Sequence, residues 1–209
     1  MESGIAALER DALCHALTRV VSERGWAGTS PDGVAREAGI APQRFYDHFR
    51  SLEHCFVAVY DRMLARVTRT AKRAVATRTL ALGKHAWQEQ LDALFSGVLM
   101  FFSLEPALAR TCLVEGLSVG PAARARRDDA LDRFTSYVEG LRLSHGEPMP
   151  PLAAELIVLG TTELIHTRVA RGEAEQLPVL LDELRSLWFT TVEQQTGGHE
   201  PVVAVPSAA

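Results

Sequence analysis

The chain has 209 residues, 47% of them hydrophobic, which is enough for one domain of ordinary size with a packed core and a smaller second domain. Its formal net charge of -4 excludes a protein that coats nucleic acid indiscriminately, because that mode depends on excess basic charge, whereas a sequence-specific reader needs only a local basic patch. Three separated cysteines indicate neither a disulfide framework nor a zinc site. The N-terminus has no basic start of the kind that a signal peptide has, and the longest apolar run, residues 93–104, is too short to span a membrane. We therefore expect a soluble cytoplasmic protein.

Residues 5–24 carry apolar side chains at helical spacing and are followed by Gly25, a natural helix stop, so they predict a first helix. A second helix is expected to begin at Thr29, whose hydroxyl can cap the free amides of the first turn while Asp32 completes a capping box. That helix is expected to end at Gly39, where the chain needs a left-handed residue. The first helix would brace the second and the one that follows.

A third helix is expected to open at Pro42, after a three-residue turn. Phe45 and Phe49 are four residues apart and share one apolar face, which leaves the polar side chains free for other contacts. Two short helices joined by a tight turn, with Gln43 and Arg44 early in the second, form the helix-turn-helix pattern, whose second helix is shaped for the major groove of DNA.

Residues 25–49 resemble the DNA-binding domain of the tetracycline-repressor-like (TetR) family. The resemblance is carried by an aromatic residue after Gly25, and by Thr29, Ser30, Val34, Ala35, Ala38, Gly39, Ile40, Phe45, Tyr46, His48 and Phe49. Two positions depart from the family pattern, since Ala41 stands where Ser or Thr is common and Leu52 where Lys is common, and both usually help to hold the DNA backbone. The resemblance implies a dimeric transcriptional regulator that binds a palindromic operator and a small effector.

Side-chain chemistry assigns Gln43 and Arg44 to base edges, because amide and guanidinium groups make paired hydrogen bonds to adenine and guanine. Pro42 can add an apolar contact to a thymine methyl group. The family resemblance implies contacts to the DNA backbone phosphates for four residues: Thr29, Ser30, Tyr46 and His48. For Tyr46 and His48, a purely structural role in the small core is the alternative.

Beyond this head, apolar periodicity predicts further helices over residues 51–79, 85–104, 106–120, 121–143, 152–171 and 178–192, a loop at 144–151 and a disordered tail at 196–209. The helix over 85–104 is apolar nearly all round and is expected to be buried. Arg62, Arg66, Arg69 and Arg73 form one basic stripe on the helix before it, which either contacts DNA or an acidic neighbour or is simply a solvated face. The last two helices are apolar enough to predict a four-helix interface with a second copy, which the resemblance also implies.

The resemblance implies a regulatory domain in which an effector, expected to be largely apolar, binds among helices. The candidate contacts are Met63, Trp87, Phe95, Phe102, Cys112, Glu115, Tyr137 and Glu163. Each apolar member is more often plain core than a ligand contact. Polar residues within apolar helices, such as Glu115, Glu163 and His166, could bind a ligand, bridge the dimer or reach solvent.

Glu163 and His166 also form a Glu-x-x-His pair, the unit from which di-iron sites in helical bundles are built, but that site needs the unit twice and the sequence holds it once. No phosphate-binding loop, nucleophile elbow or zinc helix is present in the sequence. We therefore expect no metal site, no cofactor and no enzyme activity. The alternative is a helical-bundle enzyme or ligand-binding protein with a non-functional head.

The sequence thus predicts an all-α protein with an N-terminal three-helix helix-turn-helix domain at residues 1–50 and a C-terminal helical bundle for ligand binding and dimerisation at 51–195. The predicted function is sequence-specific regulation of transcription, with a repressor released by ligand as the first hypothesis. An activator and a corepressor-dependent repressor fit the same residues.

Overall fold

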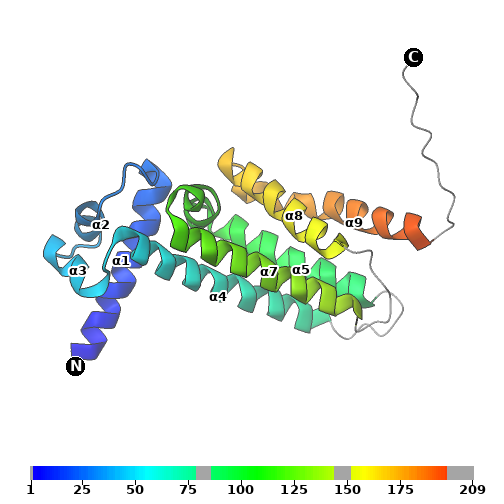
Figure 1. Ribbon diagram of the computed structural model, residues 1–209, viewed down its shortest axis with the longest axis horizontal. Helices are drawn as coiled ribbons and strands as arrows, with labels where there is room; N and C mark the ends of the chain where they lie inside the picture. The colour runs from blue at the N-terminus through cyan, green and yellow to red at the C-terminus, as the bar shows by residue number, and fades with distance from the viewer. Residues whose placement is uncertain (1, 79–85, 144–151, 197–209) are drawn as a thin grey trace, which may run out of the picture.

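The computed structural model describes residues 2–78, 86–143 and 152–196, and within these ranges all regular structure is helical (Figure 1). The elements in chain order are α1 (Glu2–Arg24), α2 (Pro31–Glu37), the 3-10 turn η1 (Pro42–Arg44), α3 (Phe45–His48), α4 (Leu52–Arg78), α5 (Ala86–Leu104), α6 (Pro106–Ala109), the π turn η2 (Arg110–Val114), the 3-10 turn η3 (Glu115–Ser118), α7 (Pro121–Leu143), α8 (Ala153–Ala170), the 3-10 turn η4 (Ala174–Val179) and α9 (Leu180–Thr196). The predicted all-α fold is confirmed. The loop expected at 144–151 and all but the first residue of the expected tail lie outside the described residues.

Helices α1, α2 and α3 lie together at one end of the molecule and form the head (Figure 1). Its core holds Leu17 of α1, Val34 of α2, and Phe45 and Phe49, each of them at most 1% exposed. The rings of Phe45 and Phe49 have centroids 5.8 Å apart, so the face that their spacing predicts is confirmed. Burial of these side chains is what holds the three helices in one unit.

The start of the second helix differs from the sequence prediction. Ser30 caps α2, because its backbone is extended and its Oγ accepts a hydrogen bond from the Gly33 amide at 3.1 Å. Thr29 is not the cap, since its hydroxyl donates to the Gly25 carbonyl at 2.8 Å and so belongs to the turn after α1. Gly25 and Gly39, with φ of 72° and 71°, have the left-handed backbone expected where a helix stops.

Helix α4 runs from the head along the bundle, with α5, α7, α8 and α9 arranged beside and above it (Figure 1). Trp87, Leu91 and Phe95 of α5 are 2% exposed or less, which confirms that this helix is buried. The Phe95 ring lies 4.4 Å from that of Trp188 in α9 and 5.5 Å from that of Phe134 in α7. Helix α5 is therefore the centre around which the bundle packs.

The single helix expected over 106–120 is wrong, because the chain there changes from the α winding of α6 to the π turn η2 and the 3-10 turn η3. This change buries Thr111 and Cys112 and turns the following residues toward the head. In the described parts of the chain no single helix is long and apolar enough to cross a bilayer, although the bent pair Trp87–Leu104 and Pro106–Ser118, at 103°, passes that test together by length and composition.

Candidate functional site

The helix-turn-helix presents polar side chains to solvent on two neighbouring elements. Pro42 occupies the first position of η1, and Gln43, Arg44 and Tyr46 are exposed on η1 and α3. At the start of α2, Ser30 is exposed and Thr29 is half-buried. A donor-rich surface on a short helix is what reading of base edges requires. Six of the seven predicted DNA contacts lie on this surface: Thr29, Ser30, Pro42, Gln43, Arg44 and Tyr46.

His48 differs from the other predicted DNA contacts because its side chain is only 8% exposed. Its Nε2 lies 2.9 Å from Oε2 of Glu9 in α1, and the same carboxylate oxygen is 2.7 Å from Nη2 of Arg44. Arg10 donates a hydrogen bond to the His48 carbonyl at 2.8 Å and lies over the Phe49 ring at 4.2 Å. His48 therefore ties the reading helix to α1, and this inward placement argues against its assignment as a phosphate contact.

Two hydrogen bonds join residues 110–118 to the head. The Trp26 amide donates to Oε2 of Glu115 at 2.9 Å, and the Thr111 hydroxyl donates to the Thr18 carbonyl at 3.0 Å. Nη2 of Arg110 lies 3.6 Å from Oε1 of Glu115 and partly balances its charge. The Glu115 carboxylate thus faces the head in this structure, and its assignment as a ligand contact stays a prediction.

A cavity of about 400 Å³ lies between α4, α5, η2, α7 and α8, within the size range of sites that bind small molecules. Its wall is largely apolar and includes Val67, Leu94, Val98, Leu113, Leu117 and Phe134. Five of the predicted ligand contacts line it: Met63, Phe102, Cys112, Tyr137 and Glu163. Trp87 and Phe95 do not line the wall, since both are packed in the core behind it.

A few polar groups reach this cavity from α4, α7 and α8, among them Tyr60, Arg127 and His166. Nδ1 of His166 is buried without a hydrogen bond and lies 3.5 Å from Oε1 of Glu163. Burial raises the pKa of the Tyr60 phenol and of the Cys112 thiol above their ordinary values, so both groups are protonated at neutral pH. The cavity suits an apolar molecule that carries a polar group. The sequence analysis did not assign Tyr60 and Arg127 to the ligand site, because each occupies an ordinary position in the pattern of its helix.

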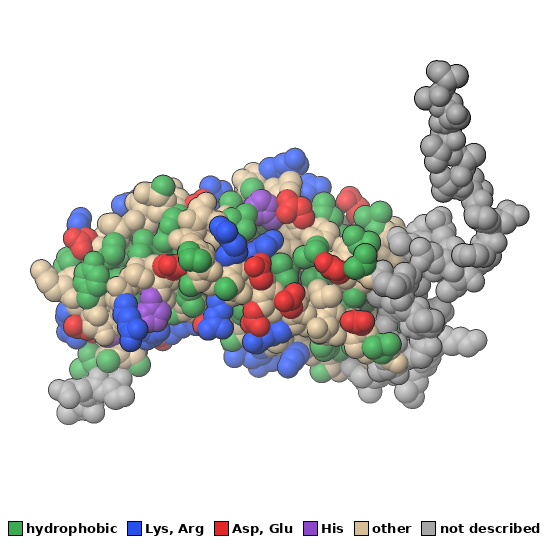
Figure 2. Space-filling view, viewed as in Figure 1, with side chains coloured by type: hydrophobic (Ala, Val, Ile, Leu, Met, Phe, Trp, Pro, Cys, Tyr) green, Lys and Arg blue, Asp and Glu red, His purple; other side chains and the backbone are tan. Residues whose placement is uncertain are grey.

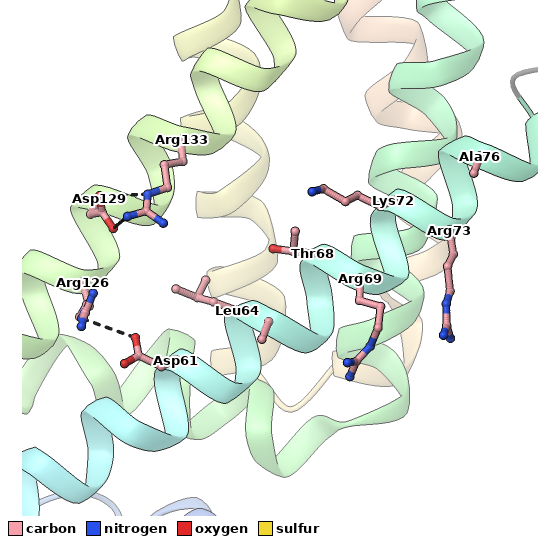
Figure 3. Close-up of a pocket in the computed structure, with 11 residues that line it drawn as sticks. Asp61, Leu64, Thr68, Arg69, Lys72, Arg73, Ala76, Arg126, Asp129 and Arg133 are labelled. Atoms are coloured by element: carbon pink, nitrogen blue, oxygen red, sulfur yellow. Dashed lines mark hydrogen bonds and ion pairs between the residues drawn. The ribbon is translucent and has the colours of Figure 1, made fainter.

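The four arginines of the predicted stripe on α4 have different surroundings. Arg62 pairs with Asp11 of α1, and Arg66 pairs with Glu105 and lies over the Phe101 ring at 5.3 Å. Arg69 and Arg73 instead line a groove of about 620 Å³ between α4 and α7 (Figure 3). In the part of the chain that the structure describes, no group of three or more His, Cys, Asp or Glu side chains is placed to hold a metal ion.

Comparison with protein families gives a match for the head. The family model for bacterial regulatory proteins of the tetR family matches residues 13–59, which span the second half of α1, all of α2 and α3 and the start of α4. The match therefore covers the helix-turn-helix and the helices that hold it.

Solved structures with a similar fold extend over nearly the whole chain. The fatty acid degradation regulator FadR from Bacillus halodurans matches with a TM-score of 0.72 and 16% identity, over 86% of this chain and 94% of that one. FadR from Bacillus subtilis, solved in complex with stearoyl-CoA, matches with a TM-score of 0.68 and 18% identity, over 85% and 96%. A TetR-like transcriptional regulator from Rhodococcus sp. RHA1 matches with a TM-score of 0.63 and 24% identity, over 88% and 96%. At these identities the similarity establishes the fold.

Replacement of Arg44 by Ala is expected to reduce discrimination between a selected DNA site and unrelated DNA by about 1 to 3 kcal/mol, because one paired contact to a guanine edge is lost. The measurement is fluorescence anisotropy at one fixed salt concentration, on a fragment that the wild-type protein has selected from random DNA and on a scrambled fragment. Arg124, exposed on α7, provides the control when it is changed to Ala. Equal discrimination by R44A and wild type would contradict the assignment.

Proposed function

We propose that this chain, whose residues 13–59 match the model for bacterial regulatory proteins of the tetR family, is a DNA-binding transcriptional regulator of that family, and that it acts as a dimeric repressor released from its operator by a small molecule. In this proposal, residues 1–50 read the operator and residues 51–195 bind the ligand and a second copy of the chain. Thr29 and Ser30 of the head, with Pro42, Gln43, Arg44 and Tyr46, are the proposed DNA contacts.

One observation carries the proposal, namely that a single segment touches both the cavity and the head. Cys112, Leu113 and Leu117 line the cavity, while Thr111 and Glu115 of the same segment make the hydrogen bonds to the head. A molecule that displaces this cavity wall therefore acts directly on residues that position α1 and the turn after it. These contacts are sufficient to transmit the effect of ligand binding to the head, without a chain of further residues between the two sites.

The proposed mechanism is a shift between two states of the whole chain. A ligand changes the operator affinity only if it binds one state better than the other. In the state described here, the head is held through Trp26 and Thr18, and we propose that the ligand favours a state in which these bonds are remade and the two heads no longer match the operator spacing.

The ligand class follows from the cavity wall. Because that wall is mainly apolar with a few polar groups, the ligand is proposed to carry a long apolar portion. FadR from Bacillus subtilis, whose fold is similar, was solved with stearoyl-CoA. We propose a ligand of this kind, an acyl chain on a larger polar group, for the present chain.

Dimerisation is proposed through α8, which packs on α7, and α9, which packs on α5; both helices lie along the upper edge of the bundle in Figure 1. Leu156 and Leu159 of α8 and Leu187 of α9 are 70%, 41% and 60% exposed. Leucines exposed on neighbouring helices are a surface that a second copy can bury, and two such pairs of helices make a four-helix interface. A two-fold dimer of this kind would place two heads on a palindromic site.

Stearoyl-CoA is expected to weaken binding of the protein to its selected DNA site by about 5- to 150-fold, the usual size of coupling between two binding sites. The measurement is anisotropy of the labelled site during titration with stearoyl-CoA, beside calorimetry of the same ligand without DNA. A nonionic detergent at the same concentration controls for micelles. Binding without loss of DNA affinity would contradict release, and absence of binding would contradict the ligand class.

Replacement of Glu115 by Ala is expected to reduce the effect of stearoyl-CoA on DNA binding. The ratio of the DNA affinity without stearoyl-CoA to that with it should be several-fold smaller than in the wild type, and so closer to one. The reason is that the Trp26 amide loses its acceptor on the cavity segment, so ligand binding is transmitted less completely to the head. Glu139, exposed on α7, gives the matched control when changed to Ala. An unchanged ratio in E115A, with normal thermal unfolding, would exclude this hydrogen bond from the coupling.

Replacement of Leu156 by Glu is expected to convert a dimer into a monomer, because a buried carboxylate without a partner opposes association. Size-exclusion chromatography with light scattering measures the mass. Leu8 is similarly exposed, at 71%, but lies on α1, so Leu8→Glu is the control that should remain dimeric. A wild-type protein that is monomeric at micromolar concentration would contradict the dimer itself.

A further inference from the structure

The groove of about 620 Å³ between α4 and α7 is strongly basic. Five basic side chains line it, Arg69, Lys72, Arg73, Arg126 and Arg133, against two acidic ones, Asp61 and Asp129. Figure 2 shows basic side chains gathered along the lower edge of the molecule, below α4. In a chain with a net charge of -4, such a local excess of positive charge is a distinct surface.

Within the described part of the chain, three of these cations have no acidic partner. Arg126 Nε lies 3.5 Å from Oδ1 of Asp61, and Arg133 Nη2 lies 3.0 Å from Oδ2 of Asp129, so both acids of the groove are already paired. Arg69, Lys72 and Arg73 have no acidic partner within 4 Å among the residues that the structure describes. All three are exposed on α4. The groove therefore offers three free cations to an anion.

The groove and the apolar cavity are neighbouring compartments with a shared wall. Leu64, Thr68 and Lys72 of α4 and Asp129 and Arg133 of α7 line both. In Figure 3, Thr68 and Lys72 point toward α7, whereas Arg69 and Arg73 extend along the outer side of α4. A molecule that leaves the cavity between these two helices would meet Lys72 first and then the two arginines.

From this arrangement we propose that the groove binds the phosphate-bearing head group of the ligand whose apolar chain occupies the cavity. The inference rests on the proposed function, because it concerns the ligand of that same cavity. Lys72 is assigned to the mouth, where it would hold the first phosphate after the chain. Arg69 and Arg73 are assigned to further phosphates, which guanidinium groups bind with two parallel hydrogen bonds.

The number and spread of the cations favour several phosphates over a single carboxylate. One carboxylate would be satisfied by one arginine, as Asp61 and Asp129 are satisfied within the groove. The groove runs from Asp61 to Ala76 along α4, which is about 22 Å at 1.5 Å for each residue. An extended head group with more than one phosphate matches this length and the three free charges, whereas a free fatty acid would leave them unused.

The test compares stearoyl-CoA, stearate and coenzyme A without an acyl chain, each below its micelle-forming concentration, on the full-length protein. Arg69→Gln/Arg73→Gln is the test variant, and Arg124→Gln/Arg171→Gln, exposed outside the groove, is the matched control. Calorimetry at two salt concentrations gives the affinities. The test variant is expected to bind stearoyl-CoA at least about tenfold more weakly and with less dependence on salt, while its affinity for stearate is unchanged.

Each other outcome overturns a different statement. Equal affinity of both variants for stearoyl-CoA would contradict the assignment of the head group to the groove, without contradicting the proposed ligand class. Equal affinity of the wild type for stearate and stearoyl-CoA would also exclude a head-group site. No binding of either acyl ligand would overturn the ligand class, and the head-group inference with it. Loss of DNA affinity in the test variant alone, with stearoyl-CoA binding intact, would assign the groove to DNA.

Discussion

The contact between Glu115 and the Trp26 amide is the constraint on which the relation of the two parts of the chain depends. Gly25 and Trp26 form the turn that ends α1, and the carboxylate that accepts this amide belongs to the bundle. Because a buried or half-buried amide without a partner costs free energy, the turn stays against residues 110–118 while the bond lasts. The Thr111 hydroxyl holds the Thr18 carbonyl on the same helix, so α1 is fixed at two points.

Close packing gives this junction little freedom. A Cβ on Gly116 would lie 3.0 Å from the Phe56 ring of α4, so a larger residue there would require that ring to shift by a few tenths of an ångström. The Ala122 amide donates to Oε1 of Glu53 in α4 at 3.0 Å, which fixes the start of α7 as well. Residues 110–122 are thus held by α1 and α4 on one side and form the cavity wall on the other. A close-packed wall of this kind moves as a unit rather than yielding locally.

Periodicity predicted the helices and the head core, because Phe45, Phe49 and the apolar residues of α5 follow the spacing that burial imposes. It could not predict which buried residues face a void, so Met63 and Phe102 line the cavity while Trp87 and Phe95 do not. The contacts that Glu115 and His48 make within the protein could not be predicted for a related reason. Their partners, Trp26 and Glu9, are 89 and 39 residues away, and only the packing of helices brings such pairs together.

The arginines of α4 follow one sequence pattern but have two different surroundings in the fold. Arg62 and Arg66 are neutralised by Asp11 and Glu105, which lie outside α4, while Arg69 and Arg73 have the same helical spacing and no such neighbour among the described residues. Folding thus leaves free positive charge at Arg69 and Arg73, toward the C-terminal end of α4, in the groove that adjoins the cavity. Free cations attract whichever anion reaches them. Because Arg69 and Arg73 lie in the part of α4 away from the head, we propose them as contacts for the ligand rather than for DNA.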